Sequence, residues 1–308
     1  MATGESAPTH STPLRPATED GLIDLMPVIE TALLQACQWP DDCPPRLAEA
    51  MRYSLLAPGK RLRPALVLMA CEAVGGTFED AAAGAVAVEM VHAYSLVHDD
   101  LPAMDDDDLR RGRPTTHIAF DEAMAILAGD ALLAAAFERL AAANAPPPVV
   151  LECLRTLAHA AGPQALVGGQ VEDLAAETGG EQTIQRLEAI HRRKTGALFS
   201  ASLRIGGLLG GGTSEQLDSL AQYARPLGLA FQVVDDCLDH TATAEILGKR
   251  TGKDQARGKL TYPGLLGLDT AREMAARLVS ESLSAVDVFG NDAWRLRWLA
   301  RFVLDRSR

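Results

Sequence analysis

The segment 81–100, AAAGAVAVEMVHAYSLVHDD, is the feature that most restricts the fold. As a helix it is apolar on nearly every side, so it has to lie in the middle of a helical bundle. The rest of the chain agrees, because Ala and Leu dominate the apolar residues, aromatic residues make up 5%, and β-branched runs are scarce. We therefore expect an all-α protein of about ten or more helices joined by short loops.

The chain reads as one folded unit behind a polar tail. Residues 1–21 are rich in Thr, Ser and Pro and predict a disordered N-terminal tail. Breaks in the helical periodicity after this tail fall at Gly- and Pro-rich stretches, and no change of composition marks a domain boundary. Residues 22–308 are therefore expected to form a single domain, and Thr213 with Gln216 fits a capping box that starts one of its helices.

Composition excludes several classes of protein. No apolar run reaches the length of about 18 residues that a membrane span needs, and the polar N-terminus lacks the apolar region of a signal peptide, so we expect a cytoplasmic protein without a membrane span. The net charge of −12 argues against nucleic acid as a partner. Five cysteines without a C-x-x-C pair predict free, mostly buried thiols.

The first acidic motif lies in VHDDLPAMDDDDLRRGRPTTH, residues 97–117. Asp99 and Asp100 end the apolar helix, where carboxylates face the negative end of the helix dipole, so positive charge must offset them. His92, Ser95 and Asp99 follow one another at helical spacing and share a stripe, which lines a cavity more readily than a dry core.

The second acidic motif lies in AFQVVDDCLDH, residues 230–240, within another strongly apolar segment. Asp235 and Asp239 share a helix face, Asp236 lies about 100° around the helix, and Gln232 borders the same face. Buried carboxylates cost several kcal/mol each unless they are paired or bind a metal. Two such motifs on apolar helices therefore predict a ligand.

Oxygen ligands suit Mg²⁺ or Ca²⁺, and the calcium-binding EF-hand pattern does not fit around Gly112. Mg²⁺ normally binds a few carboxylates together with the phosphates of a substrate, which predicts a phosphate ester as the ligand. Four basic turns support two diphosphates, although each turn alone also fits a solvated charged surface. These turns supply Lys60 and Arg63, Arg110 and Arg111, Lys194 and Thr195, and Lys249 and Lys259.

The two acidic motifs, DDLPAMDDDDLRRGRPT and FQVVDDCLD, resemble the aspartate-rich motifs of the trans-isoprenyl diphosphate synthases, the polyprenyl synthetase family, and are most similar to those of bacterial farnesyl diphosphate synthases. GKRLRP, HRRKTGALF, LGKRTGKD and GKLTYPGLLG follow in the expected order, so the resemblance covers residues 22–308. It implies an α-helical domain around a deep cavity, usually in a homodimer. Such enzymes join isopentenyl diphosphate head to tail to an allylic diphosphate, without a protein nucleophile.

The resemblance also implies a role for each motif residue. Asp99, Asp105 and Asp235 would bind Mg²⁺, as three ions per site, with Asp100, Asp236 and Asp239 among the catalytic residues. The allylic diphosphate would be held by Arg110, Lys194, Thr195, Gln232, Lys249 and Lys259. The isopentenyl diphosphate would be held by Lys60, Arg63, His92 and Arg111, and the terminal RSR (306–308) adds cations that would help to close that site.

In the family, the residues four and five positions before the first aspartate form the cavity floor, here Ser95 and Tyr94. A bulky Tyr94 beside a small Ser95 predicts a farnesyl (C15) product, although Tyr94 lies about 140° and Ser95 about 40° around the helix from Asp99. Geranyl and geranylgeranyl diphosphate therefore stay open as products. A class I terpene cyclase and a non-catalytic synthase subunit are less favoured, because the second motif is aspartate-rich and every motif residue is present.

Overall fold

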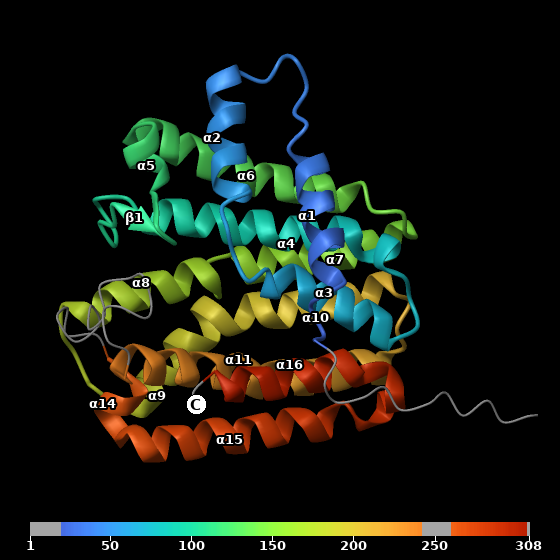
Figure 1. Cartoon of the computed structure of the whole chain (residues 1–308), viewed down its shortest axis with the longest axis vertical. Coiled ribbons are helices and arrows are strands. Elements are labelled where there is room, and N and C mark those ends of the chain that lie inside the picture. Colours follow the sequence, from blue (N-terminus) through green and yellow to red (C-terminus); the bar gives the residue numbers. More distant parts are fainter. Residues whose placement is uncertain (1–19, 242–259, 307–308) are drawn as a thin grey trace, which may run out of the picture.

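The computed structural model describes residues 20–241 and 260–306. Its helices confirm the all-α fold (Figure 1). In chain order they are α1 (Leu25–Ala36), α2 (Pro45–Leu55), α3 (Leu62–Ala73), α4 (Phe78–Asp99), α5 (Thr116–Ala119), α6 (Glu122–Ala141), α7 (Pro147–Ala161), α8 (Leu166–Glu177), α9 (Ile184–His191), the π-helical turn η1 (Arg192–Gly196), α10 (Ala197–Leu209), α11 (Ser214–Thr241), α14 (Tyr262–Leu266), α15 (Leu268–Ala285), the 3₁₀ segment η2 (Asp287–Ala293) and α16 (Trp294–Asp305).

Helix α4 is the apolar helix that the sequence predicts, and it lies inside the bundle. It contacts α1, α2, α3, α6, α7 and α10, and Val88, Met90 and Val91 are fully buried. It begins at Phe78, three residues earlier than predicted, because Thr77 and Asp80 form a capping box in which each side chain accepts from the other residue's backbone N–H. Because α4 is buried on every side, the surrounding helices hold its C-terminal end, which carries the first acidic motif, in place.

Helix α11 carries the second acidic motif in its last turns. The predicted capping box is confirmed, since the Gln216 backbone N–H donates to Thr213 Oγ1 at 3.3 Å and the Thr213 N–H donates to Gln216 Oε1 at 2.9 Å. Tyr223 is fully buried and its hydroxyl donates to the backbone oxygen of Leu296 in α16 at 2.7 Å. The C-terminal ends of α4 and α11 lie on the same side of the molecule, toward the left of Figure 1.

A short β-hairpin interrupts the helices, and the sequence does not predict it. Strands β1 (Leu109–Arg110) and β2 (Arg113–Pro114) pair antiparallel across a loop of two residues. Arg111 and Gly112 in this loop have φ angles of 52° and 74°, the combination that a tight primed hairpin turn requires. Strands of two residues are too short to show an alternating pattern, so the sequence indicates a loop here.

Asp20 and Gly21, which the sequence places in the N-terminal tail, form hydrogen bonds at the edge of the bundle. The backbone oxygen of Gly21 accepts a hydrogen bond of 2.8 Å from Arg295, and Asp20 accepts from the Leu22 N–H. All five cysteines are free, and Cys43 is the one that is not fully buried, which confirms the expectation for the thiols. Among the helices in residues 20–241 and 260–306, none is long and apolar enough to cross a membrane.

Candidate active site

Asp99 and Asp105 lie together at the C-terminal end of α4. The loop after the helix folds back on it, because the Asp105 N–H donates to the Asp99 backbone oxygen at 2.8 Å. Burial raises the pKa of the Asp99 carboxyl to about 6, the positive charge of Lys194 opposes this rise, and the charge of Asp105 adds to it. This carboxylate pair therefore favours a bound cation.

Asp100 is 3% exposed and binds Arg110 from the hairpin. Arg110 Nε donates to both carboxylate oxygens at 2.8 and 3.0 Å, and Nη2 lies 2.6 Å from Oδ1. Burial raises the pKa of Asp100, against the hydrogen bond from Arg110. Because Asp100 fixes this guanidinium beside Asp99, the positive charge that the helix end requires comes from the same motif.

Lys194 lies in η1, a π-helical turn of a kind often found at functional sites. Its Nζ lies 2.7 Å from Asp173 Oδ2 of α8, and both side chains are mostly buried. The sequence interpretation missed Asp173. The glycines of GGQVED, residues 168–173, are the sequence feature that could have indicated this contact. A Cβ on Gly169 would lie 2.5 Å from the Lys194 backbone nitrogen, so this glycine permits the close approach of α8 and η1.

Asp236 points into a network of hydrogen bonds inside the protein. Its Oδ1 accepts from Gln232 Nε2 at 3.1 Å, its Oδ2 accepts from the backbone N–H of Tyr262 at 3.0 Å, and it is 5% exposed. Thr195 in turn donates to Gln232 Oε1 at 3.3 Å. The geometry therefore places Asp236 as an anchor for Gln232 and the start of α14, while Thr195 and Gln232 form one unit across η1 and α11.

Asp235 and Asp239 lie one helical turn apart on α11 and are both partly buried. Arg306, at the end of α16, donates from Nη2 to Asp235 Oδ1 at 2.8 Å. The sequence interpretation assigned the terminal cations to the isopentenyl site, whereas the structure brings Arg306 to the second acidic motif. An arginine therefore lies against each of the two acidic motifs, Arg110 on the first and Arg306 on the second.

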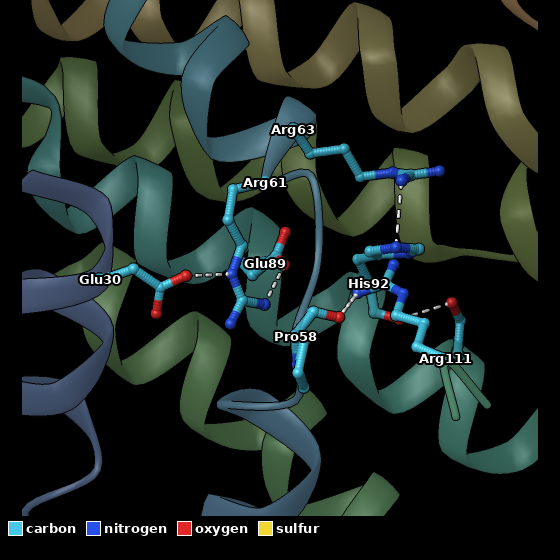
Figure 2. Close-up of polar contacts among 8 residues, drawn as sticks. Glu30, Pro58, Arg61, Arg63, Glu89, His92 and Arg111 are labelled. Carbon is cyan, nitrogen blue, oxygen red and sulfur yellow. Dashed lines mark hydrogen bonds and ion pairs between the residues drawn. The ribbon is translucent and has the colours of Figure 1, made fainter. Parts of the chain in front are cut away.

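Arg63, His92 and Arg111 form a cationic cluster beside the first motif (Figure 2). Arg63 Nη1 lies 3.1 Å from His92 Nε2, and Arg111 donates to the backbone oxygen of Pro58. Burial lowers the pKa of His92 well below its usual value, and the charges of Arg63 and Arg111 lower it further. A neutral imidazole accepts from Arg63, which places the ring proton on Nδ1.

A cavity opens next to this cluster, lined in part by Arg61, Glu89, His92, Arg110 and Arg111. Lys60 is exposed at the surface of the turn that precedes Arg61. Lys249 and Lys259, which the sequence assigned to the allylic diphosphate, lie outside the described residues.

Tyr94 and Ser95 face different surroundings on α4. Tyr94 is 5% exposed, and its ring packs edge-on against His98 at 5.7 Å. His98 in turn lies against α6, where it donates to the Ile126 backbone oxygen at 3.0 Å. Ser95 is partly buried, and its hydroxyl donates to the backbone oxygen of His92 at 2.9 Å. Tyr94 thus belongs to the contact between α4 and α6.

The donor chemistry fits a hard divalent cation. Within residues 20–241 and 260–306, no group of three or more His, Cys, Asp or Glu side chains is arranged to hold a metal by itself. Mg²⁺ keeps several waters and takes one or two carboxylates together with substrate phosphates, so a site completed by a diphosphate suits it. The raised pKa of Asp99 is the observation that supports this fit, since a bound cation would stabilise the charged carboxylate.

Comparison with known proteins places the chain in a family. The model of the polyprenyl synthetase family matches residues 44–288, and the chain belongs to this family. It is 51% identical over 243 residues to geranylgeranyl pyrophosphate synthase of Capsicum annuum, covering 78% of this chain and 66% of the relative. It is 49% identical over 255 residues to the heterodimeric geranylgeranyl pyrophosphate synthase large subunit 1 of Arabidopsis thaliana, covering 81% and 69%.

A solved structure agrees with this fold. The apo crystal structure of an FPP/GFPP synthase from Zymomonas mobilis superposes with a TM-score of 0.81 at 40% identity, covering 92% of this chain and 99% of that one. The chain is thus similar both to plant geranylgeranyl pyrophosphate synthases and to a bacterial FPP/GFPP synthase.

Proposed function

We propose that the protein condenses isopentenyl diphosphate with an allylic diphosphate, head to tail and dependent on Mg²⁺. The observation that carries the proposal is the pairing of two unlike groups at one end of the bundle. One group is the carboxylates of α4 and α11 with their cations, and the other is the cluster of Arg63, His92 and Arg111. Two diphosphates, one bound through metal and one bound directly by cations, would satisfy both groups.

The allylic diphosphate belongs on the carboxylate side in this proposal. Asp99, Asp105 and Asp235 would hold Mg²⁺, as three ions, with Asp100 and Asp239 in support. When bound, Mg²⁺ would neutralise the diphosphate and stabilise the charge that develops on it as the allylic C–O bond breaks. Lys194, Arg110 and Thr195 would donate to the same leaving group, and Asp236 would keep Gln232 turned toward it.

The isopentenyl diphosphate belongs at Arg63, His92 and Arg111, with Lys60 at the rim. These residues would fix its double bond next to the allylic carbon, so that positioning supplies part of the rate enhancement. The double bond would then form the new C–C bond and the condensation product would lose a proton. The departing diphosphate is the base in this proposal, which assigns no side chain to that step.

We propose geranylgeranyl diphosphate as the product. The Capsicum and Arabidopsis relatives, at 51% and 49% identity, are named as geranylgeranyl synthases. The geometry of α4 agrees, because Tyr94 packs toward His98 and α6 and leaves the small Ser95 one turn below Asp99. A farnesyl product is the second candidate, favoured by the bulk of the buried Tyr94 and by the similarity to the Zymomonas FPP/GFPP synthase.

Two substitutions test whether Ser95 or Tyr94 limits the length of the prenyl product. Ser95→Phe places a ring on the Asp99 face and is expected to shorten the product from C20 to C15. Tyr94→Ala, which removes bulk from the contact between α4 and α6, is expected to leave the product at C20. Chromatography of the dephosphorylated products measures both, and the opposite pattern would make Tyr94 the floor.

The proposed function is tested with the purified protein, Mg²⁺, isopentenyl diphosphate and the C5, C10 and C15 allylic diphosphates in separate reactions. We expect a C20 alcohol after dephosphorylation from all three primers, and no product with EDTA. An end at C15, with the C15 primer inert, would make the protein a farnesyl diphosphate synthase. No condensation with any primer would contradict the proposed reaction.

The expected homodimer and the cytoplasmic location stay predictions. The Arabidopsis relative named above is a subunit of a heterodimer, so the assembly state of this chain requires its own measurement. Light scattering after size exclusion is expected to give twice the chain mass of 32.7 kDa. A mass of one chain would contradict the homodimer.

A further inference from the structure

Arg61 is a buried arginine for which the proposed function has no role. Its guanidinium donates from Nε to Glu30 of α1 at 2.7 Å and from Nη1 to Glu89 of α4 at 2.8 Å. Arg61 is 5% exposed and Glu89 is 4% exposed. Figure 2 shows the guanidinium between the two carboxylates, while Arg63 extends in another direction, toward His92.

The backbone at Arg61 is strained. With φ of 49° and ψ of 34° it lies in the left-handed region, which is unfavourable for a non-glycine residue because Cβ comes too close to the following carbonyl oxygen. Only Arg61, Asp106 and Arg111 combine a side chain with a positive φ within residues 20–241 and 260–306. All three lie in the turns that carry the proposed site residues, which indicates that the strain is retained for the shape of those turns.

The chain Glu30–Arg61–Glu89 connects directly to the isopentenyl cluster. Arg63 follows Arg61 by two residues, and His92 follows Glu89 by one helical turn on α4. The turn before Arg61 is also held from the other side, because Arg111 donates to the Pro58 backbone oxygen. A Cβ on Gly59 would meet the Arg111 guanidinium, so the glycine lets this turn and Arg111 approach each other closely.

Glu89 also affects the charges of the arginines in the isopentenyl cluster. Burial lowers the pKa of Arg63 to about 10, the charge of Glu89 opposes this, and the charge of Arg111 adds to it. Arg61, Arg63 and Arg111 thus share the field of the buried Glu89. Three arginines therefore face two carboxylates, Glu30 and Glu89, so positive charge is left over for a diphosphate.

We propose that Arg61 and Glu89 are positioning residues for isopentenyl diphosphate, because their ion pair holds the left-handed turn that precedes Arg63 and that Arg111 contacts from the hairpin at Pro58. The inference rests on the proposed function and deepens it for one of the two substrates. In this inference Arg61 and Glu89, which line the edge of the cavity, act through the turn that they hold, and the carboxylate side of the site does not depend on their ion pair.

The test is a comparison of Michaelis constants in Glu89→Gln and Arg61→Lys. Both variants are expected to raise KM for isopentenyl diphosphate about tenfold, with KM for the allylic diphosphate and kcat within about twofold of wild type, since a loss of ground-state positioning at one substrate changes that KM alone. The Glu30 side chain is 40% exposed, so Glu30→Gln is the variant least expected to disturb folding. It is expected to raise the same KM about threefold.

Arg295→Lys is the matched control, because Arg295 is equally buried and also binds two carboxylates, Asp24 and Glu72, away from the proposed site. It is expected to lower the melting temperature as Arg61→Lys does and to leave both KM values unchanged. Equal changes of both KM values in the Arg61 and Glu89 variants, or a loss of kcat alone, would overturn the positioning role. Failure of the wild type to condense the substrates would instead overturn the proposed function, before any variant is compared.

Discussion

Two buried arginines, Arg61 and Arg295, show how the two ends of this molecule differ. Each binds two carboxylates and is at most 5% exposed. Arg295 lies in the regular backbone of α16, where Asp24, Glu72 and the Gly21 oxygen take up its donors. Arg61 lies in a left-handed turn whose neighbours are further cations.

The difference indicates that the end with Arg295 is suited to stabilising the fold, whereas the end with Arg61 is suited to binding a ligand. At Arg295 two carboxylates more than balance one cation, so no further ligand is needed. At Arg61 the neighbouring Arg63 and Arg111 leave the cations in excess of the buried Glu89, and at α4 the carboxylates of Asp99 and Asp105 repel each other. Groups of like charge, one set of each sign, thus lie close together at the same end, an arrangement that suits an anion together with a cation.

The largest expected effect comes from the acidic part of the binding end. Asp99→Asn is expected to lower kcat/KM about 1,000-fold, since it removes a group that acts on developing charge. The metal-free variant is expected to melt at the same or a higher temperature, because burial penalises the Asp99 charge. Asp106→Asn, an exposed change in the same loop, is the matched control and is expected to stay within about twofold of wild type. A full loss of activity in the control would contradict this assignment.

The converse is expected at the other end. Arg295→Met is expected to lower the free energy of unfolding by about 2 kcal/mol, because it removes a buried guanidinium that binds Asp24, Glu72 and the Gly21 backbone oxygen. The kcat/KM of the folded fraction is expected to be unchanged. Urea unfolding with activity measured per folded molecule checks both, and Arg301→Met on the exposed face of α16 is the control, with less than about 0.5 kcal/mol of change. A selective loss of kcat/KM in Arg295→Met would remove the distinction between the two ends.

The smallest expected effect is a pH dependence from His92. Its pKa in the folded protein lies well below the usual value, whereas the unfolded chain binds a proton near pH 6.5. The unfolded state therefore binds more protons below that pH, and His92 lowers the stability as the pH falls. Between pH 7.5 and 5.5, the wild type is expected to lose about 1 kcal/mol more than His92→Gln. Equal pH slopes in the two proteins would show that His92 is not held neutral.

The sequence predicts what depends on local pattern. The apolar 81–100 stretch gives α4, Thr213 and Gln216 give the start of α11, and the requirement for cations beside Asp99 is met by Arg110 and Lys194. These predictions succeed because periodicity, capping and charge spacing act within a few residues.

What the sequence does not predict depends on contacts between distant segments. Asp173 meets Lys194 across 21 positions, and Glu30 meets Arg61 across 31. A solvated helix face would carry the same acidic residues, so no local pattern separates a surface carboxylate from one that binds a site cation. The left-handed conformation of Arg61 is not predicted either, because arginine rarely adopts it without tertiary contacts that hold it there.

The most direct test of the two-site account is calorimetric binding of each substrate with and without Mg²⁺. Isopentenyl diphosphate is expected to bind the wild type one to one in EDTA, since Arg63, His92 and Arg111 need no metal. An unreactive thiolo analogue of the allylic diphosphate is expected to bind only after Mg²⁺ is added, because its site consists largely of carboxylates. If isopentenyl diphosphate also required Mg²⁺, or if the analogue bound equally well in EDTA, the division into a cationic site and a carboxylate site would be wrong.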